Sequence, residues 1–178
     1  NGKLTVSASN VLIEGIKFKA TVSDLKTVSF TGASQNIVFK NCIFDGSLYT
    51  DVSDPQYQGS VFFHGTNFSG SFVLENCEIR GYTSWMLADL TTDSATPTVA
   101  LSTVEIKDCR FIDCKGSFAC RGLTATPTEI VSIVGNTWEY STLTATSMHP
   151  SFWNCFEANN SKEVVCRYNK AVCTRLGG

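Results

Sequence analysis

The chain has 178 residues, of which 43% are hydrophobic, and this is enough for one domain with a substantial core. A formal net charge of −2 excludes the basic surface that binding to nucleic acid requires. No run of about 18 apolar residues occurs, which excludes a membrane-spanning helix. We expect a single domain over residues 1–178, and the start at Asn1 suggests a processed protein or part of a longer one.

Short segments, mostly rich in apolar residues, occur six times along the chain and are separated by polar loops. We expect each of them to form a strand. In chain order they are 4–8 (LTVSA), 28–32 (VSFTG), 61–65 (VFFHG), 86–90 (MLADL), 118–122 (FACRG) and 155–159 (CFEAN).

Each of these segments precedes an eleven-residue pattern, which is clearest at 36–46 (NIVFKNCIFDG). The central residue of the pattern, which we call the anchor, recurs at intervals of 26 to 35 residues: Ile13, Phe39, Leu74, Ile106, Ile133 and Cys166. The residue two positions earlier is always apolar: Val11, Ile37, Phe72, Val104, Val131 and Val164. A spacing of two is typical of a β-strand with one buried face.

Two residues after the anchor the pattern predicts a corner, at Gly15, Asn41, Asn76, Asp108, Gly135 and Tyr168. Five of these six are residue types that tolerate a left-handed backbone. The next residues are Ile16, Cys42, Cys77, Cys109, Asn136 and Asn169, and two further on lie Phe18, Phe44, Ile79, Phe111, Trp138 and Ala171. Both sets can point inward only if one residue is used in turning, so two strands should meet at each corner.

Repetition of this unit about every 30 residues predicts an all-β solenoid with three strands per coil. The pattern resembles the right-handed parallel β-helix of the pectin-lyase-like superfamily, over residues 4 to 173, with about six coils. A leucine-rich repeat is the main structural rival, but the asparagine and helical return of that repeat are not visible.

The cysteines are interpreted in two groups. Cys42, Cys77 and Cys109 occupy the same repeat position, so we expect free thiols stacked in the core. Five others could include a disulfide, which the sequence does not assign: Cys114, Cys120, Cys155, Cys166 and Cys173. With two histidines and no CxxC, we expect no metal site and no cofactor.

A candidate ligand site comes from the first strand of each coil. When these strands are aligned by their last inward residue, the next outward positions in four consecutive coils are His64, Asp89, Arg121 and Glu157. A stacked column of these side chains could bind an acidic sugar, because guanidinium groups pair with carboxylates. The alternative is a solvated column whose cross-strand charge pairs stabilise the solenoid. In pectin-lyase-like enzymes the corresponding sheet commonly lines the substrate groove, as the resemblance implies.

The resemblance does not settle whether the chain is an enzyme, since the family's fold carries many activities. The motifs of its polygalacturonases, pectate lyases and pectin methylesterases are missing from this sequence. We therefore expect a secreted or cell-surface domain that binds a polysaccharide or oligosaccharide without cutting it. A polysaccharide lyase, hydrolase or esterase, and a structural spacer, adhesin or viral fibre component, remain alternatives. At the solenoid ends we expect a capping domain or a homo-oligomer partner, because strand edges are otherwise exposed.

Overall fold

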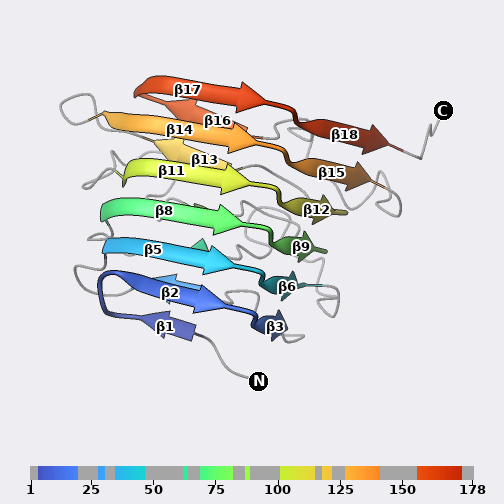
Figure 1. Cartoon of the computed structure of the whole chain (residues 1–178), viewed down its shortest axis with the longest axis horizontal. Helices are drawn as coiled ribbons and strands as arrows, with labels where there is room; N and C mark the ends of the chain where they lie inside the picture. Colours follow the sequence, from blue (N-terminus) through green and yellow to red (C-terminus); the bar gives the residue numbers. More distant parts are fainter. Residues whose placement is uncertain are drawn as a thin grey trace, which may run out of the picture.

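The computed structural model describes residues 4–19, 28–30, 35–46, 62–63, 69–81, 87–88, 101–114, 118–121, 127–140 and 156–173. Within these ranges all regular structure is β-strand, and the strands form three six-stranded sheets in which every pairing is parallel (Figure 1). The chain visits the three sheets in turn. The arrangement is consistent with a parallel β-solenoid, and we call each set of three consecutive strands a repeat.

The three sheets are named by the order in which the chain reaches them. The first contains β1 (Leu4–Val6), β4 (Val28–Phe30), β7 (Phe62–Phe63), β10 (Leu87–Ala88), β13 (Phe118–Arg121) and β16 (Phe156–Asn159). The second contains β2 (Val11–Glu14), β5 (Gln35–Lys40), β8 (Ser69–Glu75), β11 (Leu101–Lys107), β14 (Thr128–Val134) and β17 (Ser161–Arg167). The third contains β3 (Lys17–Lys19), β6 (Ile43–Asp45), β9 (Glu78–Arg80), β12 (Arg110–Ile112), β15 (Thr137–Tyr140) and β18 (Lys170–Cys173).

The register of the second sheet confirms the predicted anchors. Each anchor is paired with the anchor of the next repeat, from Ile13 and Phe39 at one end to Ile133 and Cys166 at the other. All six predicted first strands are also present, in the first sheet. Apolar side chains that repeat along the sequence therefore stack directly on one another in space.

The corners between the second and third sheets lie at the predicted residues. All six have a positive φ, from 50° at Asn76 to 72° at Gly135. The corner does not interrupt the backbone hydrogen bonds, because Asn41 N donates to Glu75 O (3.1 Å) and Glu78 N donates to Cys42 O (2.9 Å). On the outside, Asn76 Nδ2 donates to Asn41 Oδ1 (2.8 Å). A left-handed residue thus turns the chain while both flanking strands keep their pairing.

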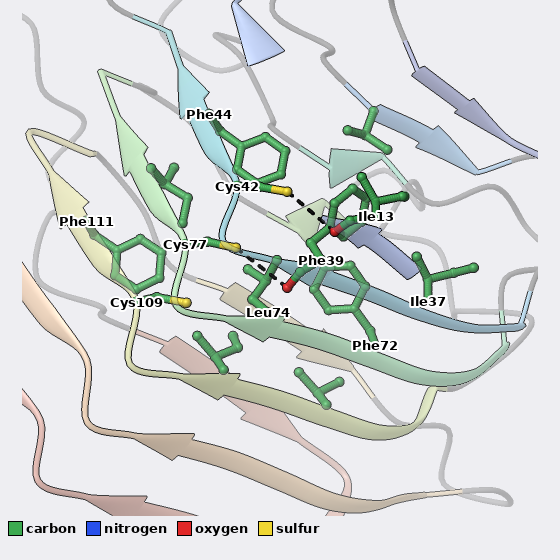
Figure 2. Close-up of a cluster of buried hydrophobic side chains, with 14 of the residues drawn as sticks. Ile13, Ile37, Phe39, Cys42, Phe44, Phe72, Leu74, Cys77, Cys109 and Phe111 are labelled. Atoms are coloured by element: carbon green, nitrogen blue, oxygen red, sulfur yellow. Dashed lines mark hydrogen bonds between the residues drawn. The ribbon is translucent and has the colours of Figure 1, made fainter. Parts of the chain in front are cut away.

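Aromatic and aliphatic side chains fill the interior between the sheets (Figure 2). Phe39, Phe44 and Phe72 have no exposed surface. The rings of Phe18 and Phe44 stack with centroids 4.9 Å apart, and Phe39 meets Phe44 edge to face at 5.6 Å. These geometries are the favoured ones for aromatic pairs and stabilise the stack beyond the burial of apolar area.

At four corners the following residue donates a side-chain hydrogen bond to the anchor carbonyl of the preceding repeat. In two repeats the donor is a thiol, from Cys42 Sγ to Ile13 O (3.5 Å) and from Cys77 Sγ to Phe39 O (3.6 Å), as Figure 2 shows. Later it is an amide, from Asn136 Nδ2 to Ile106 O (2.9 Å). Cys42, Cys77 and Cys109 are free and buried, so the predicted stacked thiols are confirmed.

Replacement of a corner residue tests the left-handed conformation. We expect Asn76→Val to reduce the free energy of unfolding by about 1–3 kcal/mol, because a β-branched residue is strained at positive φ. Asn76→Gly, which also loses the bond to Asn41 but relieves the backbone, is the matched control and should cost less. Denaturant titration measures both, and equal losses for the two variants would contradict the expected role of backbone strain.

Thiol labelling tests the buried stack. Burial raises the pKa of the Cys42 thiol and raises that of Cys109 well above its ordinary value, so both should stay protonated and unreactive. Cys166 is free and exposed and serves as the internal control. We expect peptide mapping to find Cys166 labelled in the native protein and Cys42, Cys77 and Cys109 labelled only after unfolding. Native labelling of all four at similar rates would show that the stack is accessible.

Candidate ligand-binding surface

The four residues of the predicted column are only partly within the described structure. His64 and Asp89 lie outside the described residues, while Arg121 ends β13 and Glu157 lies in β16, the next strand of the first sheet. The register pairs Arg121 with Asn159, and Ala119 with Glu157. The expected alignment of Arg121 with Glu157 is therefore wrong by two residues.

This difference has a physical reason. The pairing aligns the two aromatic residues that begin these strands, Phe118 and Phe156, and so leaves Glu157, the second residue of β16, two positions away from Arg121, the last residue of β13. The expected alignment treated Cys120 and Phe156 as equivalent positions, because strands this short offer few apolar residues to compare. A role for His64, Asp89, Arg121 and Glu157 in ligand binding stays a prediction.

The described residues show a second polar surface, on the outer side of the third sheet. Charged side chains from successive repeats form one connected series of ion pairs, which we call the charged row. Its members are Lys17, Asp45, Glu78, Arg80, Arg110 and Glu139. The signs alternate along the series, and the row extends from β3 to β15.

Strand alternation places these charges. In β9 the central residue, Ile79, is fully buried, so Glu78 and Arg80 on either side of it point away from the core. In β12 the same holds for Arg110 beside the buried Phe111. The sequence carried this signal in the two positions that flank the last apolar residue of each repeat. It was missed because only the outward position of the first strand was considered.

One end of the row is a largely desolvated pair. The side chain of Asp45 is 6% exposed, and its carboxylate accepts a hydrogen bond from Arg80 Nη2 at 2.8 Å. Lys17 Nζ lies 3.8 Å from the same carboxylate. The hydrogen bond to Asp45 raises the pKa of Arg80, which therefore keeps its charge. This end of the row is held in place mainly by burial of one partner.

The other end of the row is open to solvent. Arg110 grips Glu139 with two hydrogen bonds, from Nε at 2.8 Å and from Nη2 at 2.7 Å, and its Nη1 reaches Glu78 at 3.4 Å. The side chain of Arg110 is 52% exposed. Its hydrogen bonds lower the pKa of Glu139. This fork orients the guanidinium and leaves part of it accessible to a ligand.

The described residues were also compared with the requirements of a metal site and of a membrane-spanning helix. Among the described residues no three His, Cys, Asp or Glu side chains are grouped so as to hold a metal ion. No helix among them is long and apolar enough to cross a membrane.

Comparison with known proteins finds no protein-family model, no curated protein and no solved structure that matches this chain. Function must therefore be inferred from the fold and its surface.

Removal of the Arg110 fork should be visible in the titration of Glu139. We expect Arg110→Gln to raise the pKa of Glu139 towards the ordinary glutamate value, because the hydrogen bonds that stabilise the carboxylate are lost. The depressed pKa in the folded protein makes a stabilising contribution above the ordinary glutamate pKa, and this is lost as the pH falls through the folded pKa. In Arg110→Gln that acid-sensitive contribution should shrink.

Carboxyl-resolved NMR titration measures the pKa of Glu139, and denaturant titration between neutral and acidic pH measures the stability. Arg80→Gln is the matched control, because it removes a guanidinium from the same row without touching Glu139. An unchanged Glu139 titration in Arg110→Gln would mean that the fork is not populated in solution.

Proposed function

We propose that the chain is a right-handed parallel β-helix of about six coils, forming one domain over residues 1–178 and similar to the pectin-lyase-like superfamily. Three features support this. All three sheets are parallel, each repeat adds one strand to each sheet, and a left-handed corner joins the second sheet to the third. A right-handed path is also the rule for crossover connections between parallel strands.

We further propose that the domain binds a polysaccharide or oligosaccharide, outside the cell or at its surface, without cutting it. The charged row is the observation that carries this proposal. It presents guanidinium and carboxylate groups from consecutive repeats along the direction in which the strands stack. Consecutive strands are about 4.8 Å apart, which is comparable to the length of one sugar unit in an extended chain.

The chemistry of the row suits a ligand with many hydroxyl groups. A carboxylate such as Glu78 accepts hydrogen bonds from hydroxyl groups, and a guanidinium such as Arg110 donates to hydroxyl or carboxylate oxygens. Arg110 is half exposed and already oriented by Glu139, so little side-chain entropy is lost on binding. An acidic sugar would gain most, because its carboxylate can compete for the guanidinium.

A spacer or fibre role is the second candidate, and a specific observation favours it. The charges of the row satisfy one another, from the Lys17 and Asp45 pair to the Arg110 and Glu139 pair. Cross-strand pairs of this kind stabilise a sheet by about 0.2–1 kcal/mol each without any ligand.

Titration with defined glycans tests the proposal. We expect the wild-type protein to bind oligogalacturonides, with neutral oligosaccharides of equal length bound more weakly. Arg110→Gln should weaken binding if the charged row is the site, and Arg121→Gln should weaken it if the predicted column is the site. Lys40→Gln is the matched control, because Lys40 pairs with Glu75 (2.9 Å) on the second sheet, outside both surfaces.

The assay also separates the alternatives. Release of reducing ends or unsaturated products would show an enzyme rather than a binding domain. Absence of binding by the wild-type protein to every acidic and neutral glycan tested would reject the carbohydrate proposal and favour the spacer or fibre role. Denaturant titration of each variant shows whether a loss of binding reflects a loss of fold.

A further inference from the structure

The inward side chains of the last repeat are less covered than those of the repeat before it. In the first repeat Val6, Ile13 and Phe18 are only 5–8% exposed, while Ile16, which follows the corner, is 46% exposed. In the last repeat Val164 is 45% exposed, although its register partner Val131 is 1% exposed, and Cys166 is exposed above the buried Ile133. Among the described residues, the inward side chains of β17, at one edge of the second sheet (Figure 1), are therefore less covered than those of β14 beside it.

Among the described strands, β17 has a neighbour on one side only. β17 is the last strand of the second sheet, and its register partners lie in β14. Gly135 N donates to Arg167 O (3.0 Å), so the polar groups of Arg167 face β14. Backbone groups of successive residues point to opposite sides of a strand, so those of Val164 and Cys166 face the free edge. The residues with uncovered inward positions are thus the ones whose backbone needs a partner.

The charges along β17 favour one register in which the β17 strands of two copies of the chain could pair. Outward positions in β17 alternate with the inward ones and include Glu163, Val165 and Arg167. An antiparallel pair with a two-fold axis at Val165 places Glu163 of each copy opposite Arg167 of the other. A two-fold axis at Glu163 or at Arg167 would instead bring like charges together. Only the axis at Val165 gives two opposite-charge pairs, related by symmetry.

The same register gives the free backbone groups of β17 hydrogen-bond partners and covers its exposed inward side chains. It places Val164 of each copy opposite Cys166 of the other, as a pair that exchanges both backbone hydrogen bonds. The inward faces of both copies lie on the same side of the continued sheet, so each exposed Val164 gains an apolar neighbour. We propose that β17 is an interaction surface for a second copy of this chain, and that two copies join end to end through an antiparallel β17 pair centred on Val165.

A head-to-tail arrangement fits less well. It would stack the last repeat of one copy on the first repeat of the next, where Ile13, the residue at the position of Cys166, is already covered although Ile16 is 46% exposed. It could pair Arg167 with Glu14, because both lie at the same outward position of the second sheet, through the successive register partners. Repetition of that contact would give filaments of increasing length, whereas the two-fold contact stops at a dimer.

Sedimentation velocity over a range of protein concentrations, with reductant present, tests the proposal. We expect a species of twice the 19.4 kDa chain mass that dissociates on dilution. Glu163→Arg and Arg167→Glu, tested singly, should each weaken dimerisation at least about tenfold, because each places like charges opposite one another. The double variant Glu163→Arg with Arg167→Glu should restore the dimer, since the two opposite-charge pairs are formed again in reverse.

Two further variants complete the test. Val164→Lys should also give a monomer, and its melting temperature shows whether the fold survives; if it does not, the charge-reversal series decides alone. Glu14→Arg is the matched charge reversal at the other end of the same sheet and should leave the dimer unchanged. A monomeric wild-type protein, a dimer lost in Glu14→Arg, a double variant that stays monomeric, or a dimer that needs oxidised Cys166 would each overturn the proposal.

Discussion

The structure depends on keeping the backbone hydrogen bonds unbroken where the chain turns from the second sheet into the third. Two devices contribute to this. A left-handed residue such as Asn41 turns the chain while its own N–H still bonds to the next repeat. The second device, present at four of the six corners, is a side-chain hydrogen bond from the following residue to the anchor carbonyl of the preceding repeat. A buried carbonyl left without any partner would cost about 1–3 kcal/mol.

The second device explains why cysteine and asparagine share one position. A thiol is small and apolar enough for a core of stacked rings, and it still offers a weak donor to the Ile13 or Phe39 carbonyl. Asn136 is fully buried and does more: its amide donates to Ile106 O and its oxygen accepts from Cys109 N. Its side chain also bonds to Asn169 in the next repeat. A buried amide is tolerated there because every polar atom has a partner.

The requirements at the corners also explain which features the sequence could predict. Anchors and corners were predictable because both require particular residue types at fixed spacing, and the register of the second sheet follows from them. The first sheet has no such marker. β7 and β10 contain two residues each, so apolar spacing alone could not fix which residues of β13 and β16 are paired. The charged row was missed because only the first strand of each repeat was considered, and its positions in the third sheet are also occupied by uncharged residues such as Ile43 and Thr137.

The inferred dimer relates the two candidate surfaces. Its two-fold axis is perpendicular to the second sheet, so it reverses the strand direction and exchanges the first and third sheets across the interface. The charged row on the third sheet of one copy would then be continued by the first sheet of the other, which carries Arg121 and Glu157. An extended ligand that crosses the interface would contact both surfaces, one from each copy. In that case Arg110 of one copy and Arg121 of the other would contact the same glycan only in the dimer. The effect of replacing either residue on glycan binding would therefore depend on protein concentration.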